Sequence, residues 1–550
     1  TGLNLWRQRR VKSREDFMVA GRKLSLTVMV FTLICTWIGS GSFIAGAEYA
    51  AEAGWSSMWM PAGAWIGIAI IYFLAARIRT FGQFTVGDIL EVRYGKAARV
   101  LGAICIVIAF TTIVSYQFRA GGYILNVASG GALSVEMGQL IAAAFVILFT
   151  ALGGMVAVAN TDLPNGIIIM VACCAAAPFV VVGAGGWTEG ISHLPASHVQ
   201  VFAEDFGKYP LLKGISYCLA TLLLLMGVQS MYQKFYSAKS PAEAKRAVAI
   251  WIVGTILVEV IVIVIAIYAA SGHWDGIRAF KATTAIQAEV KAGKLDPADV
   301  PARAEALIDL DVRAGKLKPE QAASARRILE TQLSRHAGDV DSIMAARVGT
   351  DPRSIVLVAA KDVIERGGIG ILFGLLLLAA ACAVVVSTGM NYLLSPSTNV
   401  IRDIYESALG KRADEKKAVA LQRLFVFVLG ICAFLMIFVP TALHSDISVL
   451  KYSYFAYTMY GVAITPALLA ALTWKRATRA GGLASICSGA AVTLLLELVV
   501  PNAFPQLMRG SDPLGIPTIF PALLASAGSL IVVSLLTPPP DPKGIEKLFR

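Results

Sequence analysis

The sequence predicts an all-α integral membrane protein whose core consists of two inverted five-helix repeats, followed by extra C-terminal helices. Of the 550 residues, 57% are hydrophobic and only 15% are charged, whereas roughly a quarter are charged in a typical soluble domain. About twelve apolar stretches approach the ~20 residues that a helix needs to cross a bilayer. Two of these stretches, at matching places in the two halves, are interrupted by small and polar residues. Paired interruptions of this kind are typical of inverted repeats.

The predicted spans follow one another as two repeats, the second of which contains an insertion. The first repeat occupies residues 25–185, and the second occupies residues 211–270 and 369–473. Because five spans per repeat is an odd number, the second repeat crosses the membrane in the opposite sense to the first. Two accessory spans lie within residues 480–536, before a tail at 537–550. The spans are expected at residues 25–50, 56–77, 98–128, 136–155, 162–185, 211–232, 248–270, 369–395, 420–440, 446–473, 480–500 and 516–536.

The charge of the loops predicts the orientation of the chain. Basic residues cluster in alternate loops, among them residues 1–24 and 234–246, whereas the loop at 187–210 is poor in them. The positive-inside rule therefore places residues 1–24 and the C-terminal tail in the cytoplasm, as in a multi-pass protein of the inner (plasma) membrane. The net charge of +12 indicates topology rather than nucleic-acid binding. Thr1 is not an initiator Met, so both a cytoplasmic start and the loss of an earlier span stay open.

Residues 271–368 are predicted to be a helical insertion on the extracytoplasmic side. The segment is polar and Ala-rich, and it contains two similar stretches that begin at Lys291 and Arg313. In each stretch a Pro follows a Gly and a turn, and it marks the expected start of a helix. A solvated helical cap is favoured over a binding platform. Because the insertion belongs to neither repeat, residues 280–350 are expected to be dispensable.

The sequence lacks the residue patterns that several functional classes require. All eight cysteines fall in apolar spans without paired spacing, and the five histidines fall in predicted outer loops. The sequence contains no Walker loop, zinc-ligand spacing or catalytic triad. The chain is therefore expected to be a carrier of a small-molecule solute and not an enzyme.

The interruptions mark the candidate binding region. They lie at Cys35–Phe43 in the first span and at Met226–Ser230 in the sixth. Unwound backbone inside a membrane is tolerated where it lines a cavity, and paired broken helices indicate the binding site of a transporter. The hydroxyls of Ser387 and Thr388 in the eighth span would face the first interruption and, with its freed carbonyls, hold sodium. Their alternative role is a bond back to their own helix.

Four stretches in register resemble the solute:sodium symporter family. They are Asp16–Arg22, Gly153–Asp162 with Asn160 in place of a Trp, Gln229–Ser240 and Ala380–Tyr405. The resemblance covers about residues 16–535 apart from the insertion. It implies the fold of the bacterial leucine transporter, coupling to Na+ and transport by alternating access.

The resemblance also implies one sodium site between the first and eighth spans. Its ligands would be three carbonyls and two hydroxyls, those of Cys35, Ile38, Val384, Ser387 and Thr388. Asp162 matches an acidic residue near the sodium path, and its alternative role is a helix N-cap before Pro164. Some family members hold a second sodium with two further hydroxyls. Met390 and Asn391 replace these hydroxyls here, so one sodium per solute is expected.

The candidate solute-binding residues line or neighbour the two interruptions: Ser40, Ser42, Trp59, Gln117, Gln229 and Ser230. The first span resembles the choline branch of the family, which recognises a quaternary ammonium with an aromatic cage. Val228 and Val114 replace two cage positions, so a small polar or carboxylate solute is expected instead. Two ionisable residues inside spans, Glu259 and Arg119, are each expected to form an internal ion pair.

These observations favour a sodium-coupled symporter whose partners are a small-molecule solute and the lipid bilayer. Coupling requires that each ligand bind one state better than the other. A proton-coupled carrier of the same fold, with Asp162 or Glu259 titrating, is the nearest alternative. A membrane sensor or scaffold is disfavoured because only a short tail follows residue 536. A monomer would be sufficient for transport, and the sequence does not indicate an oligomeric state.

Overall fold

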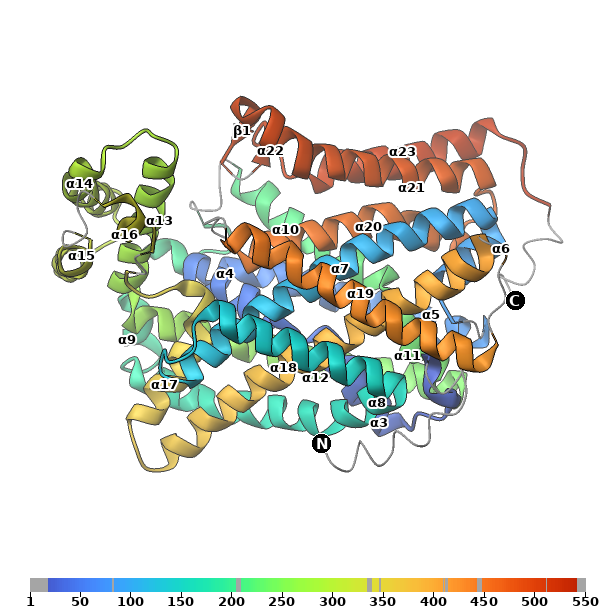
Figure 1. Cartoon of the computed structure of the whole chain (residues 1–550), viewed down its shortest axis with the longest axis horizontal. Helices are drawn as coiled ribbons and strands as arrows, with labels where there is room; N and C mark the ends of the chain where they lie inside the picture. The colour runs from blue at the N-terminus through green and yellow to red at the C-terminus, as the bar shows by residue number, and fades with distance from the viewer. Residues whose placement is uncertain are drawn as a thin grey trace.

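The computed structural model describes residues 18–81, 84–203, 209–333, 339–345, 348–408, 410, 414–442, 448–510 and 512–541. The described part is almost entirely helical, with one small hairpin formed by β1 (Met508–Arg509) and β2 (Asp512–Pro513). Long helices pack side by side in an elongated bundle, with a separate helical lobe at one end (Figure 1). Most of the expected cytoplasmic segment 1–24, and most of the tail 537–550, lie outside the described residues.

The first span is a helix in two pieces. Its first piece, α3 (Leu26–Trp37), ends at Ile38, whose φ of −72° and ψ of 84° are not helical. The second piece begins with the π-helical turn η3 (Gly41–Ala45) and continues as α4 (Gly46–Ala53). The next elements of the first repeat are α5 (Trp59–Phe81), α6 (Val86–Tyr94) and α7 (Lys96–Ala128). The first predicted interruption is therefore a real break between two helices.

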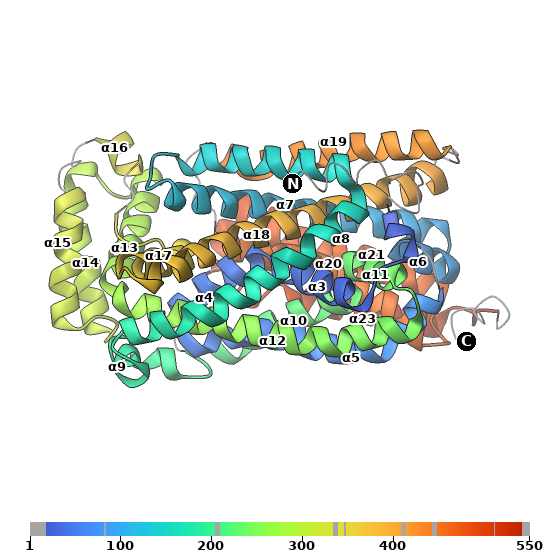
Figure 2. The same ribbon diagram turned by 90° about the horizontal axis from the view of Figure 1, so that it is seen from below.

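Two predicted spans share helix α8 (Val135–Gly183). A straight helix of its 49 residues would be about 74 Å long, more than twice the ~30 Å thickness of a bilayer core. Gly154 reverses the chain with φ 56° and ψ −162°, a conformation that is essentially restricted to glycine. Figure 2 shows α8 running along the bundle and returning. Asp162 consequently lies inside the returning arm, so the N-cap interpretation of this residue is wrong.

The second repeat also begins with a broken helix, but its break is a single residue. Between α10 (Pro210–Gly227) and α11 (Gln229–Ser237), Val228 is extended with φ −62° and ψ 118°. The Tyr460 hydroxyl donates to the Gly227 carbonyl at 2.7 Å and accepts from the Gln229 N–H at 3.0 Å. This one hydroxyl satisfies two backbone groups that the break releases, as the interior of a membrane protein requires.

The remaining helices of the second repeat surround the same core. They are α12 (Pro241–Gly272), α18 (Ile369–Asn399) with its continuation η10 (Val400–Ala408), α19 (Glu415–Ala442) and α20 (Val449–Thr473). Helix α18 packs against α7 and α8, and α10 packs against α5 and α20. Ten helices of the described chain are long and apolar enough to cross a membrane.

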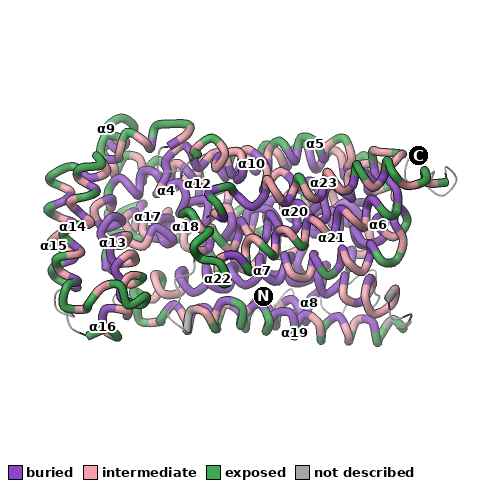
Figure 3. The backbone as a smooth tube through the Cα atoms, turned by 90° about the horizontal axis from the view of Figure 1, so that it is seen from above, coloured by how far each residue is buried: buried purple, intermediate pink, exposed green. Residues whose placement is uncertain are grey.

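The centre of the bundle is buried, whereas many residues along its outer helices are exposed (Figure 3). Leu148 on α8, Val253 on α12 and Ile431 on α19 are 50%, 65% and 52% exposed. Apolar side chains on an outer helical surface face lipid in a membrane-spanning protein. The chain is accordingly a multi-pass membrane protein.

Residues 271–368 form a lobe and a return helix. The lobe contains α13 (Trp274–Lys291), α14 (Val300–Arg313), α15 (Pro319–Gln332) and α16 (Val340–Ala345). It contacts the bundle through an ion pair between Lys281 and Glu52 at 3.0 Å. Its two ends are close, because the Thr350 N–H donates to the Gly276 carbonyl at 3.0 Å. The return helix α17 (Ile355–Glu365) is not part of the lobe, since it packs against α12 and α18.

The two accessory spans form a pair beside the second repeat. Helices α21 (Arg479–Leu494) and α23 (Ile519–Leu536) pack closely together and lie along α20 (Figure 1). The short helices α9 (Trp187–Ser192) and α22 (Val500–Ala503) belong to connecting segments. The accessory pair therefore flanks the bundle without interrupting either repeat.

Candidate functional site

The first break and helix α18 bring four oxygen atoms together. The Thr388 hydroxyl lies 2.8 Å from the Cys35 carbonyl oxygen and 3.2 Å from that of Ile38. The Ser387 hydroxyl lies 3.3 Å from the same Cys35 oxygen. Val384 is buried one turn earlier on α18, so its carbonyl points along the helix toward the turn that contains Thr388. Four of the five expected sodium ligands, Cys35, Ile38, Ser387 and Thr388, are thus in contact, and Val384 lies one turn before Thr388.

The local sequence explains why these carbonyls are available. The last carbonyls of a helix have no partner within the helix, and α3 ends at Trp37. The Gly39 N–H turns back to the Trp37 carbonyl at 2.8 Å instead of continuing the helix. A Cβ atom on Gly39 would lie 2.6 Å from the Thr388 methyl carbon. The glycine is therefore needed for the close approach of α18 to the break.

The Asp162 carboxylate lies directly beside this oxygen cluster. It accepts hydrogen bonds from the Ser387 hydroxyl at 3.0 Å and from the Asn391 amide at 3.1 Å. The Thr32 hydroxyl donates to it as well. Ser387 is thus shared between the oxygen cluster and a fully buried acidic group, so a cation at the cluster would be close to a negative charge.

Lys234 is a functional candidate that the sequence analysis missed. It was assigned to a basic loop, but it lies on α11 and its side chain is fully buried. The ammonium donates to the Asn391 side-chain oxygen and to the Met155 sulfur, the latter at 3.5 Å. It also attracts Asp162 electrostatically. The sequence offered one signal for this role, because Lys234 lies in the Gln229–Ser240 stretch at the end of a broken span.

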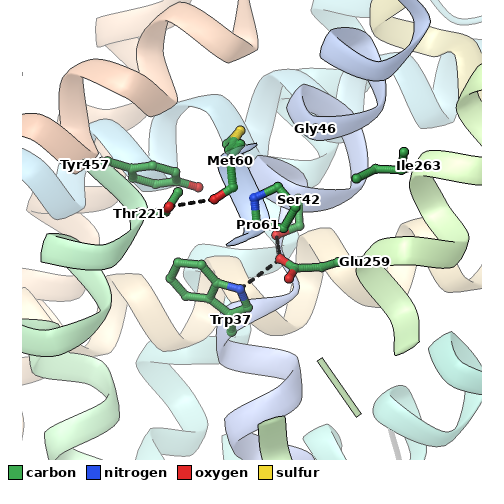
Figure 4. Close-up of a pocket in the computed structure, with 9 residues that line it drawn as sticks. All are labelled: Trp37, Ser42, Gly46, Met60, Pro61, Thr221, Glu259, Ile263 and Tyr457. Atoms are coloured by element: carbon green, nitrogen blue, oxygen red, sulfur yellow. Dashed lines mark hydrogen bonds between the residues drawn. The ribbon is translucent and has the colours of Figure 1, made fainter. Parts of the chain in front are cut away.

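A separate cavity lies on the other side of the first break. It is a small, partly open space bounded by α3, η3, α4, α5, α10, α12 and α20. Trp37 and Ser42 from the break face Glu259 of α12 across it, and Tyr457 of α20 lies on the far side (Figure 4). The rings of Trp37 and Tyr457 are stacked, with centroids 6.5 Å apart.

Glu259 is held in this cavity by neutral donors. One carboxylate oxygen accepts from the Trp37 indole N–H and the Ser42 hydroxyl, both at 2.9 Å. The other accepts from the Trp65 indole N–H at 2.7 Å. Among the described residues no basic side chain pairs with Glu259, so the expected internal ion pair is wrong for this residue. Arg119 does form an ion pair, with Glu136 at 3.3 Å.

The other predicted solute residues divide into two groups. Ser42 lines the cavity, and Ser40 lies at the break, where its N–H donates to the Gln117 side-chain oxygen at 3.1 Å. Trp59 does not line the cavity, because its indole donates to Val201 at 2.9 Å and stacks on Phe202.

The residues from the second break do not line the cavity either. Gln229 accepts from the Val86 N–H and donates to the Phe84 carbonyl at 3.3 Å. Ser230 is buried on α11. The break in the sixth span is therefore occupied by internal hydrogen bonds.

A family model and curated relatives match most of the chain. The model of the sodium:solute symporter family matches residues 17–289 and 341–489 and leaves out part of the lobe. The osmoregulated proline transporter OpuE of Bacillus subtilis is 24% identical over 97% of this chain and 92% of its own length. A sodium/proline symporter of Staphylococcus aureus is 24% identical over 96% of this chain and 88% of its own.

Solved structures show the same fold. A Na+-coupled sialic acid symporter in a substrate-bound outward-open state has a TM-score of 0.66 at 13% identity, covering 98% of this chain and 95% of that one. MhsT in complex with L-phenylalanine has a TM-score of 0.51 at 14% identity, covering 93% and 98%. The fold is therefore the leucine-transporter type, with two five-helix repeats and accessory C-terminal helices.

Proposed function

Because the chain belongs to the sodium:solute symporter family, we propose that it moves a small polar organic solute across the cytoplasmic membrane with Na+ that binds at the first break. The observation that carries this proposal is the convergence of the Cys35 and Ile38 carbonyls with the Ser387 and Thr388 hydroxyls. Oxygen ligands of this kind suit a hard cation. The Val384 carbonyl would complete the set, and Asp162 would assist the entry or release of the ion.

Coupling follows from the way in which one break serves two sites. Cys35 and Ile38 face α18, whereas Trp37 and Ser42, which belong to the same short segment, face the solute cavity. An ion that fixes the two carbonyls also fixes the side chains that bind solute. Sodium then favours the conformation that binds solute best, and the loaded carrier changes the side to which it opens. An ion with equal affinity for both conformations would drive nothing.

The first test is uptake into proteoliposomes. Proline is the first solute to try, because two relatives carry it in their names. We expect an inward sodium gradient to stimulate uptake, and the double variant S387A/T388A to lose this stimulation and the sodium-induced rise in unfolding midpoint. Ser485 and Thr493 are buried hydroxyls on the accessory helix α21, so S485A/T493A is a matched control that should keep both.

Two outcomes would contradict the proposal. Undiminished sodium stimulation in S387A/T388A would remove these hydroxyls from the ion site. Uptake driven by a proton gradient without sodium would instead indicate a proton-coupled carrier. Insertion of each variant should be checked by its elution as a single species, because a misfolded variant would also lose uptake.

A further inference from the structure

The Glu259 carboxylate is an anionic group that faces the solute cavity from inside the membrane. It is 4% exposed, and both of its oxygens accept hydrogen bonds from indole N–H groups. An indole is only a donor, so neither oxygen has room for a proton that points at its indole. Toward Trp37, Ser42 and Trp65 the carboxyl group acts only as an acceptor. A carboxylate at such a depth is costly unless it has a partner or faces a polar cavity.

The partner of Glu259 is not found in the described chain. Trp37, Ser42 and Trp65 are neutral, and no described lysine, arginine or histidine forms an ion pair with the carboxylate. A carboxylate offers about four acceptor positions, of which three are occupied. One position therefore remains on the oxygen that Trp65 contacts, and Glu259 itself lines the cavity.

We propose that Glu259 recognises a protonated amine of the transported solute, with Trp37 and Tyr457 flanking the ammonium. This inference rests on the proposed function, because it assigns the solute class of the same carrier. An ammonium would donate to Glu259 and interact with the aromatic faces.

The surroundings of Glu259 select against other ligands. Sodium requires several hard oxygen atoms, whereas the groups that contact the carboxylate are two indole N–H donors and the Ser42 hydroxyl, which all donate to it. A solute whose only charge is a carboxylate would be repelled by Glu259. Among the small polar or carboxylate solutes expected from the sequence, the proposal therefore favours those that carry an amine, including amines that also carry a carboxylate.

The test compares pairs of solutes that differ in the amine. L-Alanine is compared with L-lactate, and ethanolamine with ethylene glycol, each as a competitor of sodium-driven proline uptake and as a ligand in thermal unfolding of the purified chain. We expect the amine of each pair to act at least ~10-fold more strongly, as an ion-paired hydrogen bond of ~1.5–3 kcal/mol implies. This comparison needs no substitution and therefore does not depend on the folding of a variant.

The variant E259Q should weaken the response to amines by a similar ~10- to 100-fold factor, while the sodium-induced rise in unfolding midpoint remains. The matched control is E136Q, because Glu136 pairs with Arg119 away from the cavity. Equal responses to amine and deaminated partners, no response to any amine, or full amine transport by E259Q would each overturn the inference. Loss of the sodium response in the unmodified chain would instead contradict the sodium site, so the two failures are distinguishable.

Discussion

Replacing Lys234 with methionine tests whether an internal ammonium substitutes for a second sodium ion. Methionine is similar in length to lysine but carries no charge. In the unmodified chain the ammonium occupies the Asn391 side-chain oxygen, and the Asn391 amide binds Asp162 at 3.1 Å. The Asn391 oxygen is therefore already bound by a cationic group, which would repel a metal ion at the same atom. This arrangement agrees with the expectation of one sodium per solute, which the loss of the family's hydroxyls at Met390 and Asn391 first suggested.

The expected effect of K234M can be worked out from burial. Both Lys234 and Asp162 are fully buried and are bridged by Asn391. Removal of one partner of a contacting buried pair costs about 3–5 kcal/mol because the other charge stays uncompensated, and this value is the upper bound for the bridged pair. The substitution frees the Asn391 oxygen beside Asp162 and the Ser387 hydroxyl. Sodium would bind there, and at a concentration of 100 times its Kd it would recover about 2.7 kcal/mol.

The assay is thermal unfolding and uptake over a range of sodium concentrations. K234M should unfold well below the parent without sodium and recover most of the difference when sodium is added. The sodium Hill coefficient of uptake should rise from near one toward two. Lys281 also pairs with an acidic residue, but at the surface of the lobe, so K281M is the matched control and should keep the parental sodium dependence. A Hill coefficient of two in the parent, or no added sodium response in K234M, would refute the reasoning.

Two further predictions concern the extramembrane part. Replacing residues 280–349 by a short Gly/Ser linker should keep uptake within a few-fold of the parent, because the Thr350–Gly276 bond already brings the ends together; loss of uptake in correctly inserted protein would make the lobe a gate or a receptor surface. His273 donates to or accepts from Asp362 at 2.8 Å, and this interaction raises the pKa of His273 above its usual value of 6.5. The protonated pair should stabilise the protein fully below pH ~6.5, and the stabilisation should disappear as the pH rises through the higher folded-state pKa. Both side chains are about one-third exposed, so unfolding curves between pH 6 and 9 should differ from those of H273Q by less than ~1 kcal/mol; a pH response that H273Q retains in full would contradict this assignment.

The sequence was sufficient for the order of the spans and for the two breaks, because both depend on local composition. It could not show where Glu259 and Lys234 point. Glu259 lies inside an apolar helix, and the sequence of such a helix does not show which neighbour a residue faces. Lys234 was grouped with the basic loop residues that follow it, although it lies on the helix after the sixth-span break. The sequence separates the spans at 136–155 and 162–185, but it does not identify Gly154 as the point of reversal, because a two-glycine pair in an apolar run fits a helix as well as a turn.

The choice of solute residues failed at the second break for a related reason. Gln229 and Ser230 have the polarity expected of ligands, but a distant residue, Tyr460, occupies the backbone groups at this break. The approach of α20 to α10 is a tertiary contact that no local pattern records. At the first break the distant partners are the Ser387 and Thr388 hydroxyls of α18, and the role of this break as a binding region stays a prediction.

The Tyr460 hydroxyl makes the two repeats mechanically unequal. Widening the sixth-span break would separate Gly227 and Gln229 from the oxygen that bridges them and leave two backbone groups without partners, at about 1–3 kcal/mol each. The first-span break is bridged differently, by the Ser387 and Thr388 hydroxyls, whose oxygens would remain ligands of the proposed ion. The two repeats therefore share one architecture but differ at their breaks: the second repeat is the stiff half, and the first repeat is the compliant half. In the proposed transport cycle the sodium ion binds to the compliant half, and the compliant half moves relative to the stiff half.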